Sequence, residues 1–223
     1  MDFNKIHMKR KQPQNENPLN KIEDARKFLE ESLKRKRFYS LIVKHIISVR
    51  QNGKFLEIGS GPCVLTTMLA NEMREGRITA LDISEVMNKI AGEYIKKNNV
   101  GNKIEIITGD TEDEILLNKL GKYDLIYSTF AMHHWQDANK IISMLYKSLN
   151  PGGYLIIYDF IRVWWLYYLP LKCAFFPCLR SSFKIREIKN ILNVLNINNY
   201  KIQRKYFFFQ GIEINKCTVH NIK

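Results

Sequence analysis

The stretch that decides the fold is Phe-Leu-Glu-Ile-Gly-Ser-Gly-Pro-Cys at residues 55–63. The apolar run at 55–58 predicts a short buried strand, and Gly59 and Gly61 then let the backbone turn tightly. From Val64 onward, apolar residues recur at helical spacing. A strand, a glycine turn and a helix are typical of a cofactor site, because the helix N-terminus presents unpaired N–H groups to a ligand.

The spacing of the glycines distinguishes between cofactors. A dinucleotide fingerprint requires glycine where this chain has Val64, so a nicotinamide dehydrogenase is disfavoured. The pattern Glu57-x-Gly59-x-Gly61-x-Cys63 instead resembles motif I of the class I S-adenosylmethionine-dependent methyltransferases, in which the last position is usually glycine. The resemblance implies S-adenosylmethionine as cofactor. It also implies a Rossmann-like α/β sheet of seven strands in the order 3-2-1-4-5-7-6, with the last strand antiparallel and helices on both sides.

Two acids follow predicted strands at the edge where ligands of parallel sheets bind. Asp82 ends the strand expected at 77–82, and an acid there can accept hydrogen bonds from a ribose diol. The alternative is a helix cap, although Ser84 is the better cap. Asp110 follows the strand expected at 104–108, and the resemblance implies a bond to the adenine amino group. Its alternative is to cap the next helix.

The resemblance implies further cofactor contacts around these acids. Met87 either flanks the adenine or packs in the core of the following helix. The full set of residues expected at the cofactor is Glu57, Gly59, Ser60, Gly61, Asp82, Ile83, Met87, Asp110, Thr111 and Thr129.

A His-His-Trp loop at 133–135 follows the strand expected at 123–129. It resembles the loops of ubiquinone- and menaquinone-type small-molecule methyltransferases rather than the Asn/Asp-Pro-Pro-aromatic motif of enzymes that methylate amines on bases. A histidine can take a proton near neutral pH, so His133 is the candidate catalytic base, with structural packing as the alternative. For His134 a structural role is favoured. Asp159 ends the next strand and could serve the substrate side or a metal site, but no further ligand set is evident in the sequence, so a metal is disfavoured.

The chain after this point combines a family trait with an unusual insertion. Leu-Asn-Pro-Gly-Gly at 149–153 predicts a helix stop before the strand at 154–158. Residues 160–178 are rich in aromatic side chains, and the apolar run within them is too short to cross a bilayer. They could line a pocket for a flat or lipophilic substrate, lie at a membrane interface, or form a dimer contact. A helix at 183–195 and two strands turning at Gln210–Gly211 complete the expected fold.

Composition limits the class of protein. The four cysteines form no C-x-x-C pair, and no histidine is close in sequence to Cys173 or Cys178, so we expect reduced thiols, no metal site and a cytoplasmic protein. The start of the chain lacks the apolar segment of a signal peptide. The net charge is +7 over residues 1–50, −3 over 51–159 and +9 over 160–223. Basic flanks indicate an anionic partner such as nucleic acid or a phospholipid surface, unless they reflect a Lys/Asn/Ile-rich composition.

We therefore expect a flexible arm at 1–19 and one methyltransferase domain at 20–223. Within it, 20–52 would form a helical cover, 53–159 the cofactor-binding core, 160–182 the aromatic insertion and 183–223 the final helix and strand pair. The leading hypothesis is methyl transfer from S-adenosylmethionine to a small lipophilic or aromatic acceptor. The alternatives are an RNA methyltransferase and a catalytically degenerate, cofactor-binding partner subunit.

Overall fold

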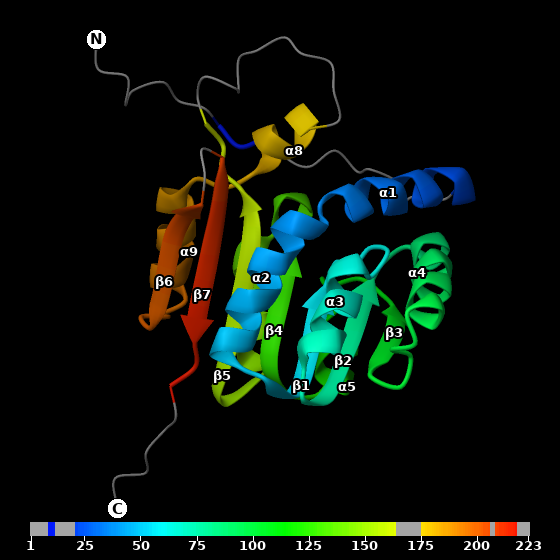
Figure 1. The fold of residues 1–223 in the computed structure, drawn as a ribbon. Coiled ribbons are helices and arrows are strands. Elements are labelled where there is room, and N and C mark those ends of the chain that lie inside the picture. Colours follow the sequence, from blue (N-terminus) through cyan, green and yellow to red (C-terminus); the bar gives the residue numbers. More distant parts are fainter. Residues whose placement is uncertain (1–8, 12–20, 164–174, 206–207, 218–223) are drawn as a thin grey trace, which may run out of the picture.

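A computed structural model describes residues 9–11, 21–163, 175–205 and 208–217 (Figure 1). Its sheet has seven strands in the order β3-β2-β1-β4-β5-β7-β6, as the sequence predicted. The strands β1 to β5 pair in parallel, and β7 runs antiparallel to both of its neighbours. The strand bounds are Asn52–Ile58 (β1), Glu75–Asp82 (β2), Ile104–Thr108 (β3), Tyr123–Thr129 (β4), Leu149–Phe160 (β5), Tyr200–Lys205 (β6) and Phe209–Asn215 (β7).

Helices cover both faces of the sheet because its central strands are buried on both sides. In β1, Leu56 and Ile58 pack into one hydrophobic cluster, whereas Phe55 packs into the other. The first cluster lies against α5, α6 and α9, and the second lies against α2, α3 and α4. The bounds of these helices are Lys36–Val49 (α2), Val64–Glu72 (α3), Glu85–Lys97 (α4), Glu114–Leu120 (α5), Ala138–Lys147 (α6) and Ile185–Val194 (α9).

Two further helices lie over the edge at which the parallel strands end. The expected helical cover begins with α1 (Ile22–Lys34), which crosses this edge toward α4 (Figure 1). The short helix α8 (Phe175–Ser181) lies above the ends of β5 and β7 (Figure 1). It was not predicted as a helix, because the sequence there reads as an aromatic insertion. Most of that insertion, 164–174, falls outside the described residues.

The helix before β5 ends near the predicted residue but not at the predicted glycine, and the turn between the last two strands does not form where it was expected. Helix α6 ends at Lys147 with Ser148 as its cap. Gly152, which was expected to end the helix, has a φ of +73° but lies inside β5. Gln210 and Gly211 were expected at the turn, yet both lie inside β7. The reason is a non-local contact: the buried Gln210 amide donates hydrogen bonds of 3.0 Å to the carbonyl oxygens of Phe160 and Phe183.

Of the expected N-terminal arm, residues 9–11 are among the residues that the structure describes. Residues 9–11 of the expected arm lie against α8, where the Lys11 N–H donates to the Arg180 carbonyl oxygen at 3.1 Å. The rest of the expected arm is outside the described ranges. None of the described helices combines the length and apolarity that crossing a membrane requires.

Candidate active site

The glycine loop between β1 and α3 is shaped by backbone conformations that favour glycine. Gly59 and Gly61 have φ values of +69° and +52°. A Cβ atom on Gly59 would lie 2.6 Å from the Cβ of Ala131, which is closer than real Cβ contacts. Cys63, which replaces the usual third glycine, takes a φ of +55° and is fully buried at the start of α3. The departure from the motif is therefore accommodated, at the cost of a left-handed conformation that side chains disfavour.

Asp82 closes the glycine loop from the end of β2. One carboxylate oxygen accepts a hydrogen bond of 2.7 Å from the Gly61 N–H, and the other accepts one of 3.0 Å from Ser84. Burial raises the pKa of Asp82, and these N–H donors oppose that rise. Ser84 itself caps α4, because its hydroxyl accepts from the Met87 N–H at 3.2 Å. Asp82 is thus not the helix cap, and its carboxylate lies beside the glycine loop, where it can also accept a hydrogen bond from a ribose hydroxyl.

Two buried hydroxyls at this edge have no hydrogen-bond partner among the described residues. They are the Oγ of Ser60 in the glycine loop and the Oγ1 of Thr129 at the end of β4. Buried polar groups of this kind are normally satisfied, and a polar ligand bound at this edge would supply their partners. The loop, the acid and the two hydroxyls fit the nucleoside and amino-acid parts of S-adenosylmethionine.

The remaining residues expected at the cofactor differ in the exposure of their side chains to solvent. Ile83 is 52% exposed beside Asp82, as an adenine-facing side chain could be. Met87 is only 3% exposed and packs with Ala25 and Ile90. Asp110 is exposed and accepts a hydrogen bond of 2.8 Å from the Glu112 N–H, with Thr111 between them. α5 begins at Glu114 with Asp113 as its cap, so Asp110 does not cap that helix.

Glu57 lies beneath the glycine loop rather than in an open site. It is 3% exposed, and its carboxylate accepts hydrogen bonds from the Thr66 hydroxyl of α3 and from the Tyr127 hydroxyl of β4 at 2.8 Å. Burial raises the pKa of Glu57 to about 8, although the two hydroxyl donors oppose that rise. Glu57 therefore joins β1, α3 and β4 below the loop.

His133 forms a buried pair with Asp159. It lies in the short 3-10 helix η2 (Met132–His134), and Asp159 lies near the end of β5. The Nδ1 of His133 is 2.8 Å from one Asp159 oxygen, and its backbone N–H donates to the other at 2.7 Å. Burial works against the charged imidazolium, but Asp159 outweighs it and raises the pKa of His133 to about 10. An imidazole that already holds its second proton at neutral pH cannot accept another, so this geometry disfavours the base role, which stays a prediction.

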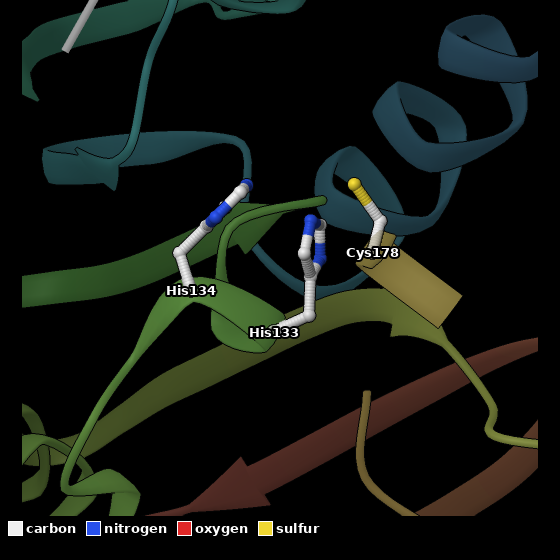
Figure 2. A group of neighbouring side chains, drawn as sticks. All are labelled: His133, His134 and Cys178. Atoms are coloured by element: carbon white, nitrogen blue, oxygen red, sulfur yellow. The ribbon is translucent and has the colours of Figure 1, made fainter. Parts of the chain in front are cut away.

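The structure brings Cys178 of α8 beside both histidines (Figure 2). The candidate ligand atoms of His133, His134 and Cys178 all lie within 4.8 Å of one another. Partial desolvation and the neighbouring His133 charge lower the pKa of His134 to about 4. The sequence analysis missed this cluster, because it looked for histidines near Cys178 along the chain and not across the fold.

Four phenylalanine rings meet at the same edge of the sheet, and we call them the aromatic cluster. The members are Phe38 of α2, Phe130 after β4, Phe160 at the end of β5 and Phe209 at the start of β7. Their ring centroids are 4.9–5.6 Å apart in five pairs, and all four rings are partly exposed. The His133 ring lies 5.4 Å from that of Phe160. No local pattern predicts this cluster, because its members come from four separate segments.

Arg10 ties α8 to the histidine-containing turn. Its guanidinium donates to the carbonyl oxygens of Ser181 at 2.7 Å and Trp135 at 2.6 Å, and lies 4.1 Å from the centre of the Phe183 ring. By contrast His45, in α2, bonds to Glu213 at 2.9 Å and to the Tyr158 hydroxyl at 2.8 Å. These contacts give His45 a structural role between α2, β5 and β7.

Comparison with known proteins finds similarity in the central segment. Residues 56–157 match the family model described as a methyltransferase domain. The chain is 34% identical over 105 residues to malonyl-[acyl-carrier protein] O-methyltransferase of Priestia megaterium, and 24% identical over 106 residues to demethylmenaquinone methyltransferase of Bacteroides fragilis. These alignments cover 47% and 48% of this chain, but only 36% and 42% of the relatives. The chain thus spans less than half the length of either relative.

The fold is shared with solved methyltransferase structures. An S-adenosyl-L-methionine-dependent methyltransferase structure from Methanococcus maripaludis superposes with a TM-score of 0.71 at 23% identity. The alignment covers 94% of this chain and 99% of the other. At this identity the likeness concerns the fold, and it confirms the architecture expected from the motifs.

Proposed function

We propose that this protein transfers the methyl group of S-adenosylmethionine to a flat, lipophilic acceptor, because residues 56–157 match the family model described as a methyltransferase domain. The observation that carries the choice of acceptor is the aromatic cluster. The cluster lies at the ends of β4 and β5. The strand β1 leads into the glycine loop and pairs with β4. Donor and acceptor would thus meet at the carboxyl edge of neighbouring strands.

The strands β1, β2 and β3, together with Thr129 at the end of β4, would hold the donor. Asp82 would bind the ribose, Asp110 the adenine, and the Ser60 and Thr129 hydroxyls would receive hydrogen-bond partners from the ligand. When bound, S-adenosylmethionine supplies a methyl group on a positively charged sulfur, which is open to in-line attack by a nucleophile. The residues of this chain mainly orient the two reactants, and such orientation lowers the barrier by removing translational and rotational freedom beforehand.

The β4–β5–β7 half would hold the acceptor. Partly exposed aromatic rings offer a stacking surface to a planar substrate and exclude water from it. Phe130 supports this assignment, because it is held at a φ of +58°, a strained conformation for a bulky side chain. Strain of this type persists where the surrounding structure enforces it, and it concentrates at functional sites.

The acceptors named for two relatives differ, and only one of them is of the proposed class. Demethylmenaquinone, named for one relative, is a lipophilic quinone, whereas malonyl-[acyl-carrier protein], named for another, is not aromatic. The RNA and partner-subunit alternatives stay predictions. The accommodation of Cys63 removes one reason for expecting a degenerate cofactor site.

The first test is calorimetric titration with S-adenosylmethionine and S-adenosylhomocysteine, with NADH as the control. We expect binding of the first two at micromolar concentrations and none of NADH. Absence of binding to both methyl-donor ligands would refute the proposed activity.

The acceptor class is tested by methyl-transfer assays with substrates of three chemical classes. A short-tailed reduced quinol, an acyl-carrier-protein thioester and an RNA oligonucleotide would each be supplied with labelled S-adenosylmethionine. We expect label on the quinol. In Phe38→Ala the KM for the quinol should rise about tenfold, or ~1.4 kcal/mol, while the donor Kd stays unchanged.

The matched control is Leu41→Ala, which removes a 49% exposed side chain from the same helix. It should leave both constants unchanged. Label found on RNA or on the thioester and not on the quinol would overturn the proposed acceptor class while leaving the donor assignment intact.

A further inference from the structure

The cluster of His133, His134 and Cys178 has the composition of a transition-metal site. The two histidines come from η2 and the cysteine from α8, so the cluster joins segments 44–45 residues apart in sequence. In Figure 2 the imidazole rings and the thiol rise from these two segments on the same side of the turn. Their candidate ligand atoms lie within 4.8 Å of one another. Two ligands of a tetrahedral zinc ion, at 2.0–2.3 Å from the metal, lie roughly 3.5 Å apart, so a small contraction would complete the site.

The surroundings of His133 orient it as metal-binding histidines are oriented. Asp159 contacts Nδ1 at 2.8 Å, so the other ring nitrogen, Nε2, faces Cys178 and is the atom that would bind a metal. A carboxylate behind a ligating imidazole fixes its tautomer and ring orientation, and it raises the basicity of the ligating nitrogen. Asp159 itself is fully buried and is held further by the His133 and Phe160 backbone N–H groups, each at 2.7 Å.

The position of Cys178 is also fixed from the protein side. The Ser182 hydroxyl donates to the Cys178 carbonyl oxygen at 2.6 Å, and the Ser181 hydroxyl donates to the same oxygen at 3.1 Å. Arg10 connects the end of α8 to the carbonyl of Trp135, one residue after the histidine pair. The two ligand-bearing segments are therefore held together by contacts that do not use the candidate ligand atoms.

The donor set selects the type of metal. Imidazole and thiolate suit zinc and other transition metals, whereas magnesium and calcium prefer oxygen ligands. We propose that His133, His134 and Cys178 bind one Zn²⁺ ion through two imidazole nitrogens and one thiolate. Binding releases two protons to solvent, one from the Cys178 thiol and one from Nε2 of the His133 imidazolium, and leaves the oxidation state of sulfur and metal unchanged. Three protein ligands leave a fourth position for water, which is the pattern of an open zinc site.

The zinc ion has a structural consequence for the acceptor side of the sheet. It pins α8 to η2 beside the aromatic cluster, since the His133 ring is 5.4 Å from Phe160. Zinc binding does not depend on methyl transfer, so the two proposals can fail separately.

The test measures zinc affinity of the full chain, reduced and stripped of metal, by competition with a chromophoric chelator. We expect one zinc per chain. Cys178→Ser and His134→Gln should each weaken zinc binding by at least about tenfold. Mutation of residues that only support a metal ligand already weakens metal binding by about 10- to 100-fold. Cys217→Ser removes an exposed cysteine elsewhere, and it should bind zinc as the wild type does.

A second readout identifies the sulfur ligand. Cobalt(II) added in place of zinc should give a thiolate-to-metal charge-transfer band in the wild type and in Cys217→Ser, but not in Cys178→Ser. Circular dichroism of the metal-free variants checks that they fold, and His134→Gln keeps the test valid if Cys178→Ser does not. Failure of the wild type to retain zinc, or equal affinity in the folded Cys178→Ser or His134→Gln variant, would overturn the proposal.

Discussion

The buried carboxyl group of Glu57 should make the stability of this protein fall as the pH rises. The side chain is 3% exposed, and the surrounding protein raises its pKa from an ordinary 4.5 to about 8, mainly by burial. The folded state thus holds a proton between about pH 4.5 and pH 8 that the unfolded state has released. Stability decreases with pH wherever the folded state binds more protons.

The magnitude follows from the distance between the two pKa values. Each pH unit corresponds to 1.36 kcal/mol, so the interval from 4.5 to about 8 amounts to at most roughly 5 kcal/mol of unfolding free energy. The contribution of Glu57 is fully favourable below pH 4.5 and is lost as the pH rises through about 8. A loss of this size is a large part of the stability of a typical domain.

The variant Glu57→Gln tests this directly, because an amide does not titrate and its oxygen can still accept from Thr66 and Tyr127. We expect the variant to gain stability relative to the wild type as the pH is raised from 5 to 9. Urea unfolding at pH 5, 7 and 9 measures the free energies. Glu72→Gln, at an exposed position of α3, serves as the control and should show no such trend.

The outcome that refutes the reasoning is a constant difference between Glu57→Gln and the wild type across this pH range. It would mean that Glu57 ionises in the folded protein near its ordinary pKa. The hydroxyl donors of Thr66 and Tyr127 would then stabilise the buried charge more strongly than burial disfavours it.

Two further predictions concern the cofactor loop. Asp82→Asn removes a charge and one of the two oxygens that accept from backbone N–H groups. Calorimetry should therefore show 10- to 100-fold weaker binding of S-adenosylmethionine, or about 1.4–2.8 kcal/mol. The control variant Asp24→Asn, at an exposed position, should bind as the wild type does. Wild-type affinity in Asp82→Asn would contradict the ribose assignment. Gly59→Ala places a methyl group 2.6 Å from the Ala131 Cβ at a φ of +69°, so thermal unfolding should show a loss of about 1–3 kcal/mol. Gly101→Ala, whose added Cβ has its nearest neighbour at 3.9 Å, should cost much less, and equal losses would contradict this explanation.

Local sequence was sufficient where the structure depends on local backbone rules. Strand β3 occupies the residues predicted for it, and α3 begins at Val64 as expected, because apolar periodicity and glycine turns act over a few residues. The order of the strands came from the family resemblance and not from local patterns.

Local sequence failed where polar or aromatic groups meet across the fold. Gln210 looked like a turn residue, yet its amide bonds two carbonyl groups, and one of them belongs to Phe183, 27 residues away. Cys178 looked isolated, although α8 brings it to His133. Such contacts depend on the tertiary arrangement, which overrides the local preferences of turn residues.

Backbone strain gives an independent indication of where the function of this protein lies. Among the described residues, four that are not glycine have positive φ values. Asn99 and Asn196 follow α4 and α9, and asparagine tolerates this conformation at helix ends. The other two, Cys63 and Phe130, directly follow the glycine loop and β4. Because left-handed conformations cost roughly 1–2 kcal/mol in ordinary residues, their placement at this edge and not elsewhere favours a shaped donor and acceptor site over a loop with no binding role.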